Sequence, residues 1–336
     1  MAVERRILHQ RLRAMMRRIA IALGVLVLLL AGLASWGLLP KGVPEPALPG
    51  RLVSGELVHD GRTRTWHAYL PARREPHPAL VFVLHGSRGD WAQARGGYGF
   101  DFDRLAEKAG FIPVYPDGFE GHWNDCRKAG PYAANRLNID DVGFLRALLA
   151  SFVKDQGVDP ARVFATGISN GGQMALRLAL EAPNLVRAVA PVVASLPAGG
   201  NLDCKQAGRP VSILIMNGTA DPMNPWKGGD VALYGLIGNR GAVLSSEDSI
   251  DYFRDIAGYT GPPEVTALPD LVSDDDSTVE VRRWHAPGKR EVVLYVIRNG
   301  GHNAPHPELR VPRLLGPTNH DISAAREIWR FFAEAP

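Results

Sequence analysis

A serine, an aspartate and a histidine stand in this 336-residue sequence at positions where they could form a hydrolytic site. The serine belongs to Gly167-Ile168-Ser169-Asn170-Gly171. A β-branched and aromatic run precedes this pentapeptide and an Ala/Leu-rich run of helical period follows it, which is the pattern of a strand, a sharp turn and a helix. The two glycines allow strand and helix to pass closely while the serine adopts a strained conformation. The pattern predicts a nucleophile, Ser169, at a strand end.

A serine hydroxyl needs an imidazole to accept its proton, and the imidazole needs a carboxylate to fix its tautomer. In the strand-turn-helix arrangement the chain order is serine, acid, histidine. Asp221 follows a buried apolar run in a tight loop, and His302 follows another apolar run and two glycines. We therefore expect Asp221 to be the acid and His302 to be the base.

Other candidates for these two roles are less well placed in the sequence. Asp230 lies farther along an insertion, Asp203 precedes its strand, and residues 274–276 form a solvated turn cluster. His306 and His320 lie in a Pro-rich loop and at the start of the last helical pattern, where surface or capping roles are expected.

Hydrolysis through a serine also needs two donors for the negative charge that develops on the substrate oxygen. The residue after the nucleophile supplies one of them, so we expect the N–H of Asn170 to act here. The second donor should lie in the loop after the first central strand, at His85-Gly86-Ser87, and we favour the N–H of Ser87. His85 itself is interpreted as a structural residue.

These residues need a scaffold that brings strand ends together. A hairpin is predicted at 52–58 and 63–69 around the Asp60-Gly61 turn. We expect further strands at 79–84, 111–115, 162–166, 188–193, 211–216, 279–285 and 291–297, and helices at 139–156, 173–181, 246–257 and 322–332. This alternation predicts an α/β fold with a mostly parallel, doubly wound sheet and functional loops at the carboxyl ends of its strands.

Several motifs occur together in order: VLHGSRGD, YPDGFEGHWNDC, DDVGFLRALL, GISNGGQMALRLA, NGTADPMNPW and GGHNAP. With them the sequence from about residue 50 onward resembles the polyhydroxybutyrate depolymerase and feruloyl esterase family of secreted serine esterases. The resemblance implies an α/β-hydrolase fold and the roles given above to Ser169, Asp221 and His302. Two-step acyl transfer by these residues needs no metal or organic cofactor. The resemblance also implies that Trp123 borders the acyl or aryl pocket, although a core aromatic under a loop is an equal alternative.

The resemblance also has departures. No polymer-binding domain is recognisable in the sequence, so soluble or oligomeric esters are expected rather than insoluble polymer. Cys126 stands where related sequences often carry glycine, and Cys204 is the other of only two cysteines. In an exported protein two cysteines suggest one disulfide, with two separate buried thiols as the alternative.

The first 40 residues differ from the rest of the chain. They contain six arginines against one glutamate, and residues 19–39 are apolar and uncharged. This span could cross a bilayer, and its basic flank would stay cytoplasmic. We interpret residues 1–18 as a basic cytoplasmic leader, 19–39 as a transmembrane anchor, 40–50 as a Pro-rich linker and 51–336 as the catalytic domain. The catalytic domain would thus lie on the periplasmic or extracellular side of the cytoplasmic membrane, and Trp36 would serve as an interfacial anchor.

The alternative is a signal peptide that is cleaved after Ala34. Cleavage there would release a secreted enzyme.

Composition excludes other function classes. The net charge of +3 comes from the leader, because the rest of the chain carries 32 basic and 34 acidic residues. A nucleic-acid partner is therefore not expected.

The predicted activity is hydrolysis of carboxylic esters of hydroxybutyrate-oligomer, feruloyl or acetyl type. A serine peptidase on the same fold and a non-catalytic membrane-tethered binding protein are the alternatives, and the sequence makes no prediction about the oligomeric state.

Overall fold

The computed structural model describes residues 2–336. The side chains at positions 2–4, 8, 10, 33, 34, 36 and 37 are outside the described set. The predicted cleavage position at Ala34 and the predicted interfacial anchor Trp36 are among them.

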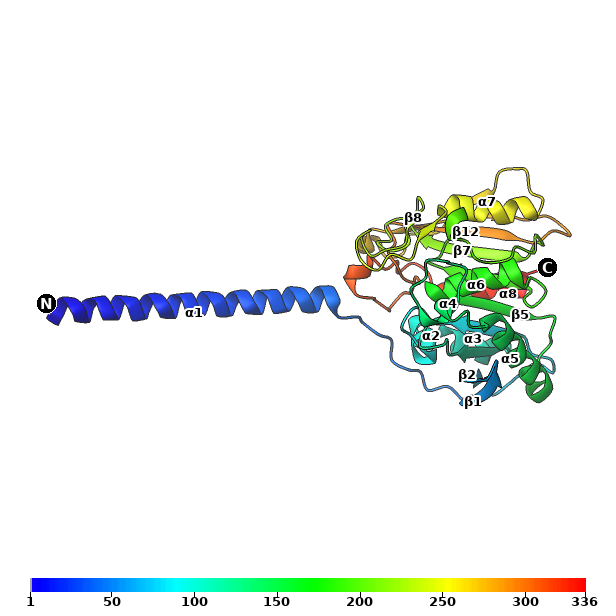
Figure 1. The fold of residues 1–336 in the computed structure, drawn as a ribbon, viewed down its shortest axis with the longest axis horizontal. Helices are drawn as coiled ribbons and strands as arrows, with labels where there is room; N and C mark the ends of the chain where they lie inside the picture. The colour runs from blue at the N-terminus through cyan, green and yellow to red at the C-terminus, as the bar shows by residue number, and fades with distance from the viewer. Residues whose placement is uncertain (1) are drawn as a thin grey trace.

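A ten-stranded sheet runs through the globular part of the protein (Figure 1). Its strands, in spatial order, are β1 (Arg51–His59), β2 (Arg62–Leu70), β4 (Ile112–Pro116), β3 (Leu80–Leu84), β5 (Val163–Ile168), β6 (Ala188–Val192), β7 (Ser212–Gly218), β12 (Val292–Arg298), β11 (Thr278–Trp284) and β10 (Glu264–Ala267). The six strands from β4 to β12 are parallel, and antiparallel strands extend both ends. The predicted mostly parallel sheet is confirmed.

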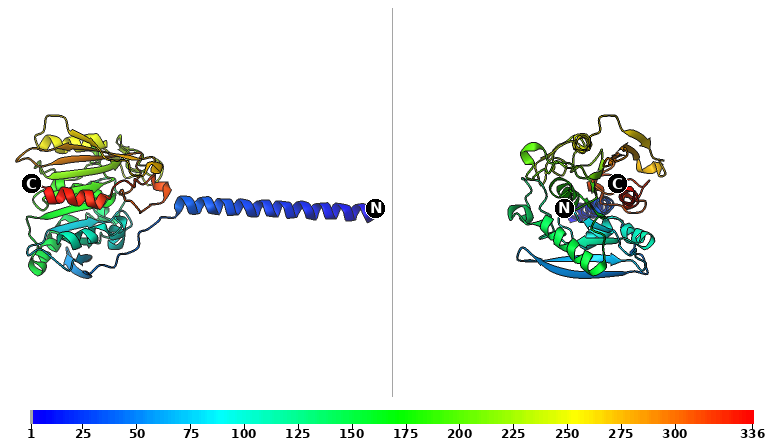
Figure 2. Two further views of the ribbon diagram at one scale, coloured as in Figure 1. Left: turned by 180° about the vertical axis from the view of Figure 1, so that it is seen from behind. Right: turned by 90° about the vertical axis from the view of Figure 1, so that its right-hand side faces the viewer.

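Helices cover both faces of this sheet (Figures 1 and 2). They are α2 (Trp91–Gly97), α3 (Asp101–Ala109), α4 (Ala133–Arg136), α5 (Asp141–Gln156), α6 (Asn170–Glu181), α7 (Ser246–Ile256) and α8 (Ala324–Glu334), with short 3₁₀ turns η1 (Gly199–Asn201), η2 (Ser273–Asp275) and η3 (Arg313–Leu315). A small separate ribbon pairs β8 (Gly229–Asp230) with β9 (Ala242–Val243). The sequence prediction missed α2, α3 and α4, which begin within Gly-rich or charged loops, and the short exposed edge strand β10.

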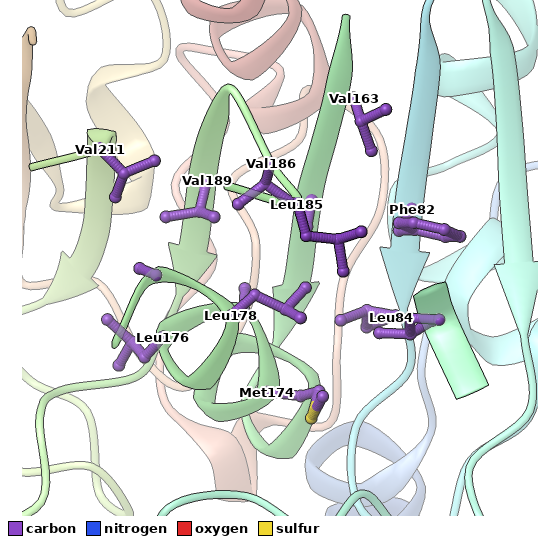
Figure 3. Close-up of a cluster of buried hydrophobic side chains, with 14 of the residues drawn as sticks. Phe82, Leu84, Val163, Met174, Leu176, Leu178, Leu185, Val186, Val189 and Val211 are labelled. Carbon is purple, nitrogen blue, oxygen red and sulfur yellow. The ribbon is translucent and has the colours of Figure 1, made fainter. Parts of the chain in front are cut away.

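The hydrophobic core forms two layers because side chains of the central strands alternate between the faces. In β3, Phe82 and Leu84 face the layer that contains α5, α6 and α7, while Val81 and Val83 face the layer that contains α3 and α8. Figure 3 shows apolar side chains of α6, including Met174, between the helix and the neighbouring strands. Burial on both faces explains why these strands read as continuous apolar runs.

The hairpin of β1 and β2 follows the predicted register. Asp60 and Gly61 both adopt positive φ, +48° and +70°, at the two-residue turn. This combination is characteristic of the tight turns that match the twist of antiparallel strands. Arg51 pairs with Leu70 and His59 with Arg62, so the two strands pair along their whole length.

The N-terminal segment forms one long helix, α1 (Ala2–Leu38), which projects from the body (Figures 1 and 2). Within the described chain, one stretch is long and apolar enough to cross a membrane, Arg5–Gly32, with a mean hydropathy of 2.1. After α1 the chain pairs with the segment that precedes η3: Lys41 and Arg310 exchange backbone hydrogen bonds of 2.8 and 2.9 Å. The linker is therefore attached to the body immediately after the helix.

Candidate active site

The turn between β5 and α6 holds Ser169 in a rare backbone conformation, with φ +58° and ψ −115°. Its N–H donates to the Val192 carbonyl at 2.9 Å, which fixes the turn against β6. A Cβ on Gly167 would lie 2.5 Å from the Gly171 backbone, and one on Gly171 would lie 2.2 Å from the Leu84 oxygen. Only glycine allows this crossing, so the sequence explains why the serine projects from a strained turn.

Asp221 and His302 form a buried hydrogen-bonded pair at the ends of β7 and β12. His302 Nδ1 lies 2.7 Å from Asp221 Oδ2. The other oxygen, Oδ1, accepts hydrogen bonds from the N–H groups of Met223 and Asn224 at 2.7 and 2.8 Å. The carboxylate therefore has a fixed orientation and accepts from Nδ1–H. In this tautomer Nε2 of the neutral imidazole carries a lone pair.

Ser169 and His302 both line a cavity of about 830 Å³. Among the described residues, His302 Nε2 is buried without a hydrogen-bond partner. Backbone hydrogen bonds hold the histidine loop, from His302 N–H to Leu315 and from Gly301 N–H to Pro317. The free nitrogen and the serine hydroxyl thus share one cavity, although no hydrogen bond joins them directly in the described chain.

The two expected oxyanion donors lie beside this turn. Ser87 lines the cavity in the loop after β3, and Asn170 is the first residue of α6. The Asn170 side chain is buried: its oxygen accepts from the Trp123 N–H at 2.8 Å, and its amide donates to the Trp123 carbonyl at 3.1 Å and to Asp125. These bonds fix the start of α6, where free N–H groups favour an anion.

His85 has the structural role expected for it. Gly118 N–H donates to its Nε2 at 2.8 Å, so its Nδ1 carries the proton and donates to the Gly86 carbonyl at 2.7 Å. Burial lowers the pKa of His85, which favours this neutral form. Both ring nitrogens are therefore occupied in holding the loop that precedes Ser87.

Trp123 does not line the cavity, so of the two alternatives left open for it the structure shows the core aromatic and not the pocket residue. Its side chain is fully buried in the core, and its indole N–H donates to the His85 carbonyl at 3.1 Å. Its backbone holds Asn170, as described above. The ring therefore packs in the hydrophobic core, where the bond to His85 holds it.

Cys126 and Cys204 are joined in a disulfide, with Cα atoms 5.1 Å apart. The alternative of two separate buried thiols is therefore wrong. The neighbouring Asp125 forms a buried ion pair with Arg127 and also accepts from the Asn170 amide. The covalent link thus lies one residue from a side chain that holds the start of α6.

The cavity wall also contains a series of side-chain hydrogen bonds that the sequence did not predict. The Arg240 Nε donates to the Tyr132 hydroxyl at 2.6 Å, and the Tyr132 and Ser87 hydroxyl oxygens lie 2.9 Å apart. His122 stacks on Tyr132 with ring centroids 4.2 Å apart, and burial lowers its pKa. Tyr132 and Arg240 come from loops without periodic pattern, so no local signal in the sequence identifies them.

The cavity walls carry an excess of positive charge. Five cationic side chains line it, against one carboxylate, Glu120; they are Lys41, Arg88, Arg136, Arg240 and Arg310. Among the described residues no group of three or more His, Cys, Asp or Glu side chains is arranged to hold a metal ion. The arrangement is suited to acid–base and nucleophilic chemistry by side chains and backbone.

A mostly parallel sheet with helices on both faces, and a serine on a strand-to-helix turn beside an aspartate–histidine pair, define a protein of the α/β-hydrolase fold. A solved structure of an acetyl xylan esterase from Aspergillus awamori has this fold; it aligns with a TM-score of 0.51 and 16% identity over 88% of this chain and 99% of its own. No protein-family model matches the sequence.

The sequence is similar to several curated esterases. "Putative esterase NocK" from Nocardia uniformis subsp. tsuyamanensis is 28% identical over 92% of this chain and 96% of its own length. "Probable feruloyl esterase C" from Aspergillus oryzae (strain ATCC 42149 / RIB 40) is 28% identical over 84% and 88%. A poly(3-hydroxybutyrate) depolymerase from Ralstonia pickettii is 27% identical over 62% of this chain and 43% of its own length. These relatives, at modest identity, support the resemblance to the polyhydroxybutyrate depolymerase and feruloyl esterase family, and their names are those of carboxylic ester hydrolases.

Proposed function

We propose that the protein is a serine esterase that uses Ser169, His302 and Asp221 in two-step acyl transfer. The Ser169 oxygen attacks the ester carbonyl while its proton passes to His302 Nε2. The same proton then goes to the departing alcohol, which leaves an acyl-enzyme. Water attacks the acyl-enzyme with His302 as base, and the acid is released. Asp221 stabilises the imidazolium, and the N–H groups of Ser87 and Asn170 bind the oxyanion.

The buried hydrogen bond between Asp221 and His302 carries this proposal. An aspartate whose one oxygen accepts two backbone N–H groups is fixed, and its other oxygen leaves the imidazole a single orientation. That orientation directs a basic nitrogen into the same cavity as a serine on a strained turn. A protein that only bound its ligand would not need either feature.

The substrate is proposed to be a soluble or oligomeric carboxylic ester of hydroxybutyrate, feruloyl or acetyl type. The relatives named above are esterases and a depolymerase, which supports this range. A cavity of about 830 Å³ is within the size usual for small-molecule sites and accommodates an aromatic acid or a short oligomer. A panel of acetyl, feruloyl and hydroxybutyrate esters compared by kcat/KM orders these candidates.

We also propose that the protein is exported and held by its N-terminal helix at the outer face of the cytoplasmic membrane. The uncharged span after six arginines and the disulfide support export. Intact-mass analysis of the membrane fraction should find Arg17 and Arg18 still present. Soluble protein that begins at Ser35 as the main product would replace the anchor with a cleaved signal peptide.

Labelling with a fluorophosphonate tests the catalytic assignment. The wild-type protein should be labelled at Ser169, and Ser169→Ala should lose both labelling and ester hydrolysis while it keeps its fold. Ser54→Ala, an exposed serine on β1, is the matched control and should behave as wild type. Full activity in Ser169→Ala would refute the esterase mechanism. Cleavage of peptide amides faster than of the corresponding esters would instead favour the peptidase alternative.

A further inference from the structure

The chain that follows α1 forms part of the active-site wall. Pro40, Lys41 and Gly42 line the cavity that also contains Ser169 and His302. Lys41 is held there by its two backbone hydrogen bonds to Arg310. The end of α1 also contacts η3. These contacts place the active-site mouth and the exit of the N-terminal helix on the same end of the molecule, opposite the C-terminus (Figures 1 and 2).

Length limits how far this mouth can lie from a membrane. Three residues lead from the end of α1 at Leu38 to Lys41, and three residues span at most about 10 Å. The headgroup region on each side of a bilayer core is about 5–8 Å thick. If α1 crosses the membrane, as the proposed function holds, the mouth of the cavity lies at or just above the headgroups.

Large apolar side chains are exposed to solvent beside the mouth of the cavity. Two loops, 233–238 and η3, present four large side chains to solvent, with exposed fractions of 57%, 86%, 66% and 45% for Tyr234, Leu236, Ile237 and Leu314 respectively. The Tyr234 hydroxyl donates to the Leu314 carbonyl at 3.1 Å, so the two loops form one surface. We call these four residues the apolar rim. Exposed apolar side chains gathered at one place mark an interaction surface.

Positively charged side chains lie close to the apolar rim. Of the five cationic side chains that line the cavity, Lys41, Arg88, Arg136 and Arg310 are exposed. Cationic side chains close to a membrane surface are attracted to anionic lipid headgroups, and aromatic and apolar residues insert at the boundary with the acyl chains. The mouth of the cavity therefore carries both exposed apolar and cationic side chains, and α1 holds it at the level of the lipid headgroups.

We propose that the apolar rim docks on the outer surface of the membrane that holds α1, and that the enzyme acts there on amphiphilic esters resident in the bilayer. An acyl or aryl group of such an ester can pass from the lipid into the cavity without crossing water. The occupant of the rim is the bilayer surface itself. This inference rests on the proposed esterase function and on the uncleaved anchor.

The test uses the full chain reconstituted in vesicles that contain phosphatidylglycerol. Two substrates are compared: 4-methylumbelliferyl palmitate embedded in the bilayer and 4-nitrophenyl acetate in water. The double variant Leu236→Glu/Leu314→Glu should lower hydrolysis of the embedded ester at least fivefold and leave that of the soluble ester unchanged. Leu271→Glu makes the same change at an exposed leucine, 70% accessible, that is not part of the apolar rim. It should alter neither rate.

A second measurement reports contact directly. An environment-sensitive fluorophore attached at Leu236→Cys should have its emission maximum at shorter wavelength in these vesicles than in detergent-free nanodiscs of zwitterionic lipid. Brominated acyl chains should quench its fluorescence. The same fluorophore at Leu271→Cys should show neither effect. Fluorescence that is insensitive to lipid at Leu236, or that changes only on addition of a second copy of the protein, would overturn the inference.

The remaining outcomes separate the two proposals. Wild-type protein that hydrolyses the soluble ester but not the embedded one overturns the docking inference and leaves the esterase assignment intact. Protein that hydrolyses neither overturns both. A mature protein that begins after Ala34 overturns both the proposed anchor and the docking inference, and it leaves the esterase assignment intact.

Discussion

The hydroxyl oxygens of Tyr132 and Ser87 lie 2.9 Å apart at the wall of the cavity. The Tyr132 oxygen accepts from Arg240 Nε at 2.6 Å, because a guanidinium can only donate. The Tyr132 hydroxyl hydrogen remains available, so either hydroxyl can donate in the bond between Tyr132 and Ser87. The bond to Tyr132 thus holds the side chain of the residue whose backbone N–H we assign to the oxyanion.

We predict that Tyr132→Phe lowers kcat by about tenfold, which corresponds to roughly 1.4 kcal/mol, while KM changes little. The substitution keeps the ring that stacks on His122 but removes the bond that orients Ser87. Steady-state kinetics with one soluble ester measure this. Tyr252→Phe, on α7 and away from the cavity, is the matched control. Equal kcat values for Tyr132→Phe and wild type would show that this hydroxyl does not orient the oxyanion donors.

Asp221→Asn should lower kcat by about 10⁴-fold, as the corresponding change does in the serine protease triad. If the asparagine oxygen keeps the bonds to Met223 and Asn224, its NH₂ group faces His302 Nδ1 and enforces the wrong tautomer. The fold should survive because the shape is unchanged. Asp230→Asn alters an exposed carboxylate and should leave kcat unchanged. Should Asp230→Asn prove the damaging variant, the acid has been misassigned.

Gly171→Ala should destabilise the protein by about 3 kcal/mol or prevent its folding, because the added methyl group would lie 2.2 Å from the Leu84 carbonyl oxygen. Gly96→Ala provides the contrast: it lies in α2 with no atom within 4 Å of the added carbon. That change should stabilise by about 0.5–1 kcal/mol. Urea unfolding of both variants measures the difference. Similar stabilities for the two would contradict the close crossing of β5 and α6.

The sequence predicts strands and turns correctly where the residue types within the element determine its structure. The apolar runs around Ser169 and Asp221 are buried on both faces, so their composition alone identifies them as central strands. The Asp60-Gly61 turn needs positive φ at both positions, and the residue types show it. The strand-turn-helix arrangement sets the chain order serine, acid, histidine, so Asp221 and His302 follow as the candidates once the strands are known.

Other features depend on contacts between distant segments. The sequence leaves Trp123 open between the pocket and the core, because the position of its ring depends on packing against His85 and Asn170. Residues 40–50 have the composition of a free linker, and nothing local shows that Lys41 pairs with Arg310. Two cysteines 78 residues apart suggest a disulfide, but only the fold brings them together.

Replacement of both cysteines, Cys126→Ala/Cys204→Ala, should lower the free energy of unfolding by about 4 kcal/mol, the value that loop-closure entropy gives for a crosslink over 78 residues. Activity should also fall at denaturant concentrations below the global transition. The reason is that Cys126 follows Asp125, which holds the Asn170 side chain at the start of α6. A loosened loop therefore disturbs the oxyanion donor before the sheet unfolds.

Unfolding curves followed by activity and by tryptophan fluorescence test this prediction. In the wild-type protein the two curves should coincide, and in the double variant the activity curve should shift to lower denaturant. A reducing agent should make the wild-type protein resemble the variant and should leave the variant unchanged. The bond would be disproved if both thiols of unreduced, unfolded wild-type protein reacted with iodoacetamide. If instead the bond exists but the two curves remain coincident after its removal, the disulfide stabilises the fold without holding Asn170, since local loosening would then not precede global unfolding.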